Sequence, residues 1–213
     1  MGFLERLCFF LNAIVAFVTP EAESILELFR SSGAYLNGHF RLTSGRHSPA
    51  YLQCALVLQY PRHAATLGGL LADALRNLAP EPAGVVVSPA LGGLIIGHEV
   101  ARAMGARFIF TERDPSGRMT LRRGFAVEPG ERALIVEDVI TTGGSTHEVV
   151  DVMRWAGARP LAAGSIVDRS GGQADVGAPR IALVTIEVPS YDPAACPLCA
   201  EGVPVEKPGS RPA

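Results

Sequence analysis

Residues 133–146 read Ala-Leu-Ile-Val-Glu-Asp-Val-Ile-Thr-Thr-Gly-Gly-Ser-Thr, an apolar run that reaches two adjacent carboxylates and then a loop of small residues. The apolar run predicts a buried strand, and the pattern that follows Ser145 predicts a helix directly after the loop. In open α/β sheets, ligands bind beyond the carboxyl ends of the strands. The stretch therefore predicts an α/β fold with a ligand site at this loop.

The loop has the features of a phosphate site. Gly143 and Gly144 let the backbone approach a ligand closely, and the N–H groups and dipole of a following helix favour an anion. Glu137 and Asp138 suit sugar hydroxyls or a metal ion, so a sugar phosphate fits the whole stretch. A turn without a ligand is the alternative, but paired acids at a buried strand end are costly without a partner. Further hydroxyl donors are Thr141, Thr142, Ser145 and Thr146.

Composition and motifs disfavour several other functions. The net charge of −2 over 213 residues argues against binding to nucleic acid or a membrane surface. The loop matches neither the P-loop nor the Gly-x-Gly-x-x-Gly pattern, which disfavours a nucleoside triphosphatase or a dinucleotide-binding protein. The apolar segment 7–18 is shorter than the roughly 20 residues that span a bilayer, and it lacks a signal-peptide cleavage site. Two of the four cysteines are isolated, so we expect a reducing, cytoplasmic setting.

The rest of the chain repeats the alternation of strand and helix. Helical patterns separate the apolar runs, and this order predicts a central parallel sheet flanked by helices. We expect an apolar extension at 1–18, a main domain at 19–190 and a tail at 191–213. The end of this tail, 202–213, is rich in proline and glycine, and we expect it to be loose. The apolar runs are 84–88, 106–112, 132–138, 161–168 and 181–187.

Glu137 to Thr146 resembles the phosphoribosyl-pyrophosphate (PRPP) binding motif of type I phosphoribosyltransferases. Other segments resemble the orotate branch of that family, in the same order, from residue 20 to about 205. The resemblance implies the type I fold, with a small hood at about 33–60 that encloses the pyrimidine. The similar segments are 38–53 in the hood, 88–97 in a second ligand loop, 110–125 in a mobile lid, 166–172 at a strand end and 187–204 in the tail.

The resemblance also implies an activity and residue roles. Orotate and PRPP would give orotidine 5′-monophosphate and pyrophosphate in de novo pyrimidine (UMP) biosynthesis, with Mg²⁺, in a homodimer whose lid reaches the partner's site. Arg169 would pair with the orotate carboxylate, Tyr51 would flank its ring, and Thr141 would face the base. The catalytic residues would be Asp138, Glu137 and Arg118. The PRPP-binding residues would be Glu137, Asp138, Val139, Ile140, Thr141, Thr142, Gly143, Gly144, Ser145, Arg113 and Gly92.

The chain departs from the family pattern in its basic residues. Thr43 stands where the hood of well-studied members has lysine, and Leu91-Gly92 replaces Tyr-Lys in the second loop. The only lysine is Lys207, so an arginine would serve as the lid cation. We choose Arg118, with Arg122 and Arg123 as further candidates.

Two other functions remain open at this stage. A purine-type phosphoribosyltransferase would share the PRPP motif without needing the hood segment or Arg169. A non-catalytic PRPP-binding regulator would keep the loop and lose turnover.

The histidines and cysteines outside the motif allow few conclusions. His47 could touch substrate or lie in a solvated turn, while His98 and His147 are expected to be structural. Asp168 could orient Arg169 or merely end a strand. Cys196 and Cys199 form a Cys-x-x-Cys pair that supplies two of the four ligands of a structural zinc, and the others would come from histidines or another subunit.

Overall fold

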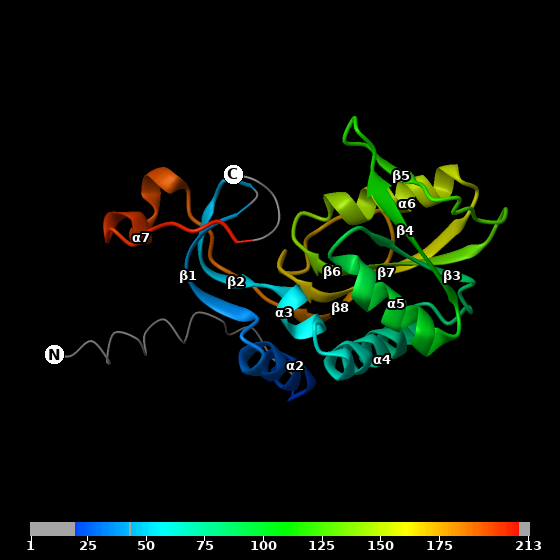
Figure 1. Ribbon diagram of the computed structural model, residues 1–213, viewed down its shortest axis with the longest axis horizontal. Coiled ribbons are helices and arrows are strands. Elements are labelled where there is room, and N and C mark those ends of the chain that lie inside the picture. Colours follow the sequence, from blue (N-terminus) through cyan, green and yellow to red (C-terminus); the bar gives the residue numbers. More distant parts are fainter. Residues whose placement is uncertain (1–19, 43, 209–213) are drawn as a thin grey trace. The chain divides into compact units, whose positions relative to one another are not determined.

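The computed structural model describes residues 20–42 and 44–208, and these form two compact units (Figure 1). The larger unit runs from Leu58 to Thr185, and the smaller unit combines the residues before and after it. The extension expected at 1–18 and the departure at Thr43 lie outside the described residues. Within these residues no helix is both long and apolar enough to cross a bilayer.

The larger unit contains a six-stranded sheet with the order β5-β4-β3-β6-β7-β8. Five strands are parallel and β5 runs antiparallel to β4, so the predicted parallel sheet is confirmed. The strands are β3 (Val85–Pro89), β4 (Arg107–Arg113), β5 (Met119–Leu121), β6 (Arg132–Ile140), β7 (Arg159–Asp168) and β8 (Arg180–Thr185).

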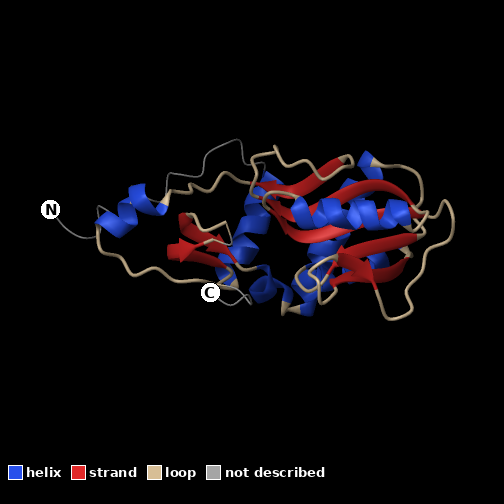
Figure 2. Cartoon of the chain, turned by 90° about the horizontal axis from the view of Figure 1, so that it is seen from above, coloured by secondary structure: helices blue, strands red, loops and turns tan. Residues whose placement is uncertain are grey.

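Helices cover the sheet of the larger unit (Figure 2). Helices α4 (Pro61–Leu78) and α5 (Gly93–Met104) pack against each other on one face, and α6 (Gly144–Trp155) covers the other. Pro61 stands at the first position of α4, where its missing N–H costs nothing. Gly105 ends α5 in the left-handed conformation.

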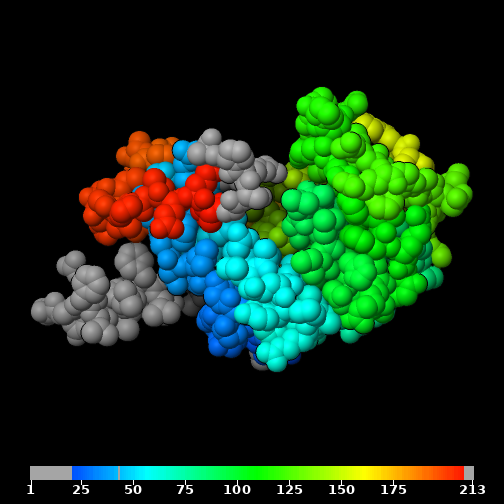
Figure 3. All heavy atoms as spheres, viewed as in Figure 1, coloured from blue at the N-terminus to red at the C-terminus, as the bar shows by residue number. Residues whose placement is uncertain are grey.

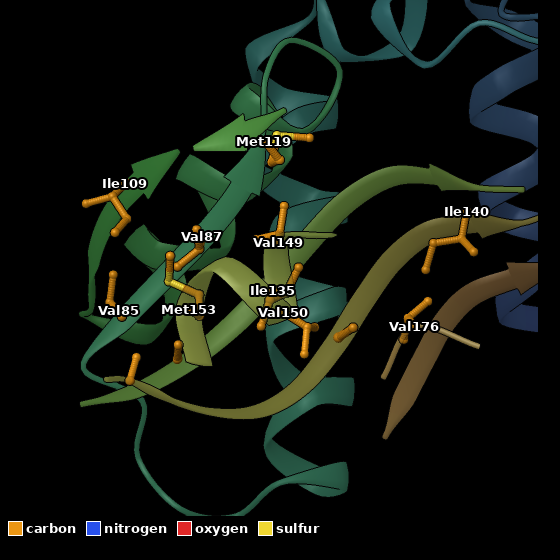
Figure 4. Close-up of a cluster of buried hydrophobic side chains, with 13 residues drawn as sticks. Val85, Val87, Ile109, Met119, Ile135, Ile140, Val149, Val150, Met153 and Val176 are labelled. Carbon is orange, nitrogen blue, oxygen red and sulfur yellow. The ribbon is translucent and has the colours of Figure 1, made fainter. Parts of the chain in front are cut away.

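A cluster of buried apolar side chains lies between α6 and the face of the sheet that this helix covers (Figure 4). Val85 and Val87 of β3 and Ile135 of β6 meet Val150 and Met153 of α6, and each is fully buried. Full burial of each such side chain contributes about 1.5–3 kcal/mol to folding. Because β3 and β6 are also covered by α5, they lie at the centre of the molecule's core.

On the opposite face, glycine allows close contact between the helices and the sheet. A Cβ at Gly164 of β7 would lie 2.9 Å from Leu75 Cδ1 of α4, and one at Gly97 of α5 would lie 2.0 Å from Ser88 Oγ. Both helices therefore approach the sheet more closely than alanine would allow.

The segment 110–125, which we expected to be a lid, contains the end of β4, the turn that follows it and β5. Asp114-Pro115-Ser116-Gly117 makes its turn, with Pro in the second position and Gly117 at φ 85°. Figure 3 shows this turn at the surface of the larger unit, in green. Arg122 and Arg123 follow the hairpin in a turn rather than a strand.

The smaller unit is built on α2 (Pro20–Ser31) and a hairpin of β1 (Tyr35–Arg41) and β2 (His47–Leu52), followed by α3 (Cys54–Leu58). The chain returns to it in η1 (Pro193–Ala195) and α7 (Pro197–Ala200). Contrary to our expectation, the described part of the tail is not loose. Arg41 N–H donates to Glu206 O at 2.7 Å, and Glu206 N–H donates to His39 O at 2.7 Å. The tail therefore extends the edge of the hairpin.

Candidate functional site

The larger unit has one point where its chain order reverses, between β3 and β6. After β3 the chain turns into α5 and continues to β4, whereas after β6 it turns into α6 on the opposite face and continues to β7. The chain therefore leaves these neighbouring strands toward opposite faces of the sheet, and α/β proteins bind ligands at the carboxyl edge at such a point. The loop after β3 contains a cis peptide bond between Ala90 and Leu91.

The loop after β3 approaches β6 at Gly92 and Asp138. A Cβ added to Gly92 would lie 2.7 Å from Asp138 Oδ1 and 2.8 Å from Oδ2. A side chain at this position would therefore have to displace the Asp138 carboxylate, which glycine leaves in place. Gly92 and Asp138 come from two separate segments of the sequence, and both were predicted to bind PRPP. The structure places these two residues next to each other.

The loop after β6 has the geometry of an anion site. Gly143 has φ 83°, and a Cβ there would lie 2.9 Å from Asp175 O, so this position also requires glycine. Gly143 is the N-cap of α6, and no side chain caps the helix. The first N–H groups of α6 therefore remain available to a phosphate. Thr141, Thr142 and Gly144 are exposed beside them.

The two carboxylates lie within β6, which extends two residues beyond them to Ile140. Glu137 Oε2 accepts a hydrogen bond of 2.9 Å from Thr146 Oγ1. Thr146 is buried, so its hydroxyl orients Glu137. We had expected this hydroxyl to donate to a phosphate. The side chain of Ile140 lies in the core under α6, which leaves only its backbone for the predicted PRPP contact.

Asp138 is held close to the backbone. Its Oδ1 accepts a hydrogen bond of 2.8 Å from Val139 N–H. Burial of the carboxyl group raises the pKa of Asp138 above its ordinary value, and the hydrogen bonds from backbone N–H groups only partly offset this effect. Such a group is stabilised by any bound cation or hydroxyl donor, which is the pattern of a binding site.

The end of β7 supplies the third part of the edge. Arg169 N–H donates to Ile140 O at 2.8 Å, so Arg169 follows directly beside the end of β6. Asp168 is fully buried and pairs with Arg180, and its Oδ1 accepts from Ser170 N–H at 2.7 Å. Asp168 thus anchors the loop after β7. Sequence reasoning did not identify Arg180, because its partner lies twelve residues away across a loop.

The arginines of the hairpin differ in their partners. Arg113 pairs with Glu148 of α6 at 2.8 Å and donates to Gly117 O at 2.6 Å, so its guanidinium ties the hairpin to the helix of the phosphate loop. Arg118 is 75% exposed and lies 3.5 Å from Asp114.

Arg123, another candidate for the lid cation, is held in place. It forms two hydrogen bonds with Glu112, at 2.7 and 2.8 Å, and lies 5.6 Å from the centre of the Phe110 ring. These contacts leave Arg118 as the most accessible of the three paired arginines in the hairpin region.

Tyr51 belongs to the smaller unit. It lies in β2, is half-buried, and its ring centre is 6.0 Å from that of Phe40.

Residues 57–192 match the family model of the phosphoribosyl transferase domain. The chain belongs to the phosphoribosyl transferase family. It is 53% identical over 189 residues to the orotate phosphoribosyltransferase of Pelotomaculum thermopropionicum, which covers 89% of this chain and 97% of that protein. It is 49% identical over 187 residues to the enzyme of the same name from Thermotoga petrophila, covering 88% and 98%.

Solved structures of this family have the same fold. The orotate phosphoribosyltransferase of Aeropyrum pernix superposes with a TM-score of 0.63 at 26% identity, covering 76% of this chain and 93% of that one. An adenine phosphoribosyltransferase from Trypanosoma brucei superposes with a TM-score of 0.58 at 16% identity, covering 80% and 82%. At that identity the second likeness shows the fold alone.

The raised pKa of Asp138 predicts how stability depends on pH. The folded protein binds the carboxyl proton more tightly than the unfolded chain, so ionisation of Asp138 lowers stability as pH rises through the unfolded value, about 3.9, toward the folded value. Asp138→Asn keeps the oxygen that accepts from Val139 and removes the charge. We expect the variant to be more stable than the wild type at neutral pH, by about 1.4 kcal/mol per unit of pKa shift.

Urea unfolding at a series of pH values measures this difference, which should shrink as pH falls toward 3.9. The matched control is Asp73→Asn, at an exposed position of α4. A variant that is less stable than the wild type at neutral pH would contradict the account of Asp138.

Proposed function

We propose that the chain is an orotate phosphoribosyltransferase, which transfers the 5-phosphoribosyl group of PRPP to orotate in the de novo synthesis of UMP. The observation that carries the proposal is the identity of 53% to a protein of that name over 97% of its length. The site supports it, because a loop suited to a phosphate directly follows two carboxylates suited to a sugar.

Each part of PRPP has a counterpart at the edge of the larger unit. The 5′-phosphate binds the N–H groups and hydroxyls of Thr141 to Ser145, at the uncapped start of α6. The ribose hydroxyls bind Glu137 and Asp138. The backbone at Gly92 lies against the Asp138 carboxylate and contacts the pyrophosphate next to it.

The residues present also fit Mg²⁺, the cofactor we propose. Glu137 and Asp138 offer the hard oxygen ligands that this ion prefers, and a bound cation would stabilise the ionised form of Asp138, whose pKa burial raises. When bound, Mg²⁺ supplies positive charge that offsets the charge on the leaving pyrophosphate.

The protein's own groups then position the substrates. Glu137, oriented by Thr146, and Asp138 hold the sugar while its reacting carbon gains positive charge. Arg169 binds the orotate carboxylate through its planar fork, and Thr141 contacts the base. These contacts hold the base in line for attack, which lowers the entropic cost of the reaction.

The assembly is also part of the proposal. We infer a cytoplasmic homodimer in which the hairpin of one subunit supplies Arg118, and Arg113 beside it, to the site of the other. The exposure of Arg118 supports its role as the lid cation, because a lid residue must be accessible before substrate binds.

The first experiment follows the ultraviolet absorbance of orotate when the protein meets orotate, PRPP and Mg²⁺, with adenine and hypoxanthine as parallel acceptors. We expect orotate alone to be consumed, and Asp138→Asn to lower kcat by about a hundredfold or more without loss of the fold. Consumption of adenine or hypoxanthine instead would favour a purine-type enzyme. PRPP binding without any turnover would favour a regulator.

Arg169 tests the orotate site separately from the PRPP site. Arg169→Ala should raise the KM for orotate about tenfold or more, because a charged hydrogen-bonded pair is lost, while the KM for PRPP stays nearly unchanged. Arg169→Lys keeps the charge but not the fork, so it should recover only part of the loss. Equal increases in both KM values would show a general disturbance of the site and reject this role.

Mixed dimers test the shared lid. Arg118→Ala and Asp138→Asn should each be nearly inactive alone. If the lid acts on the partner's site, a dimer of one subunit of each kind has one complete site, so subunits mixed and reassembled at random should recover about a quarter of wild-type activity. A mixture of Arg122→Ala and wild type is the control for subunit exchange. Failure of exchanged dimers to recover activity would reject the shared lid.

A further inference from the structure

Four side chains with metal-binding atoms meet in the smaller unit. His39 and His47 come from the strands of the hairpin, and Cys196 and Cys199 come from the tail. One donor atom of each lies within 4.8 Å of the others. His39, His47 and Cys196 are buried, with exposed fractions of 3%, 6% and 3%. His47 is therefore not the solvated turn residue that the sequence allowed.

The distances match a tetrahedral site. Cys196 Sγ lies 3.5 Å from His39 Nε2, Cys199 Sγ lies 3.7 Å from the same atom, and Cys199 Sγ lies 3.3 Å from His47 Nδ1. Ligands at ordinary zinc–sulfur and zinc–nitrogen bond lengths, arranged tetrahedrally, would be about 3.6 Å apart for sulfur and nitrogen. The two ring nitrogens are 2.8 Å apart, against about 3.3 Å in such a site. A small outward rotation of one ring makes up the difference.

The surroundings of His39 prepare it as a ligand. Its Nδ1 lies 2.7 Å from Val203 O, and because a carbonyl oxygen only accepts, Nδ1 carries the proton. Nε2 therefore presents a lone pair to the cluster. A histidine whose second nitrogen donates to a carbonyl is the usual arrangement at protein metal sites, where that bond fixes the tautomer and the ring orientation.

The backbone holds the four ligands independently of any ion. His47 N–H donates to Tyr191 O at 2.9 Å, and Tyr191 N–H donates to His47 O at 2.8 Å. Glu206 N–H donates to His39 O at 2.7 Å. The two cysteines lie across the first turn of α7, so both sulfurs reach the same point. Backbone hydrogen bonds before and after α7 therefore attach the tail to the hairpin and place the cysteines beside the histidines.

We propose that His39, His47, Cys196 and Cys199 bind one zinc ion, which fastens the C-terminal tail to the hairpin of the smaller unit. Two thiolates and two imidazoles are a soft, tetrahedral ligand set that favours zinc over Mg²⁺. All four positions are filled by protein, so the site is structural and leaves no position for substrate. The two histidines lie 149 to 160 residues before the two cysteines in the chain, so the ion closes a very long loop.

The site has a consequence for the hairpin. His47 begins β2 directly after residues 42–46, which connect β1 and β2, and His39 stands near the end of β1. A metal bound to both histidines would therefore hold the end of β1 and the start of β2 together. The sequence likeness assigns that connection to the hood, so the ion would set the hood's shape without touching substrate.

Metal analysis of the full-length protein tests the site without relying on activity. Protein purified under reducing conditions without a metal-affinity tag should contain about one zinc per chain by mass spectrometry. Cys199→Ser and His39→Asn should each lose most of it. Cys54→Ser removes a buried cysteine outside the cluster, and His98→Asn removes an exposed histidine, so both should keep full zinc.

Cobalt keeps the test decisive if those variants fold poorly. Wild-type protein stripped of metal with a strong chelator should bind Co²⁺ and show the intense visible absorption bands of a tetrahedral site with thiolate ligands. Its melting temperature should fall when the chelator removes the metal and should recover when Zn²⁺ is added. Absence of zinc and of cobalt bands in the wild type would overturn the proposal. So would a Cys196–Cys199 disulfide in freshly reduced protein, or equal zinc content in Cys199→Ser and Cys54→Ser.

Discussion

The contact between the backbone of Gly92 and the carboxylate of Asp138 is the constraint on which the site depends. It exists because β3 and β6 are neighbours and parallel while their chains leave in opposite directions, to α5 and α6. Glycine lets the loop after β3 lie this close to β6 without displacing the carboxylate, since a Cβ at Gly92 would lie 2.7 Å from Asp138 Oδ1. The same closeness buries the carboxyl group and raises its pKa. A bound hydroxyl group or cation would therefore offset the cost of burying the ionised carboxylate of Asp138. Groups with shifted pKa values of this kind are common at functional sites.

The two units hold their geometry by different means. The larger unit has a continuous core, in which α6 covers one face of the sheet while α4 and α5 cover the other, and its loops are positioned by strands buried on both sides. The smaller unit has one helix and a two-stranded hairpin, and a hairpin alone is marginally stable in water. Its tail is held by backbone hydrogen bonds to the hairpin and, in our proposal, by a metal ion at four ligands. Small units that lack a large core commonly use such an ion.

The sequence predicted most of what is local. The strand, loop and helix around Glu137 to Thr146, the alternation of strands and helices, and the family could be recognised because each rests on neighbouring residues. Long-range pairing could not be recognised. The ion pair of Asp168 with Arg180, the hold of Glu112 on Arg123, and the role of Thr146 in orienting Glu137 depend on how loops fold back. His39 was missed for the same reason, because its partners Cys196 and Cys199 lie more than 150 residues away, and the tail was wrongly expected to be loose.

A crystal structure of the protein with PRPP and Mg²⁺ tests the central claim most directly. The account predicts the 5′-phosphate on the backbone N–H groups of residues 143–145, at the start of α6, with the ribose hydroxyls on Glu137 and Asp138 and the pyrophosphate against Gly92. PRPP bound with its 5′-phosphate elsewhere, or with Asp138 facing away from the sugar, would contradict it.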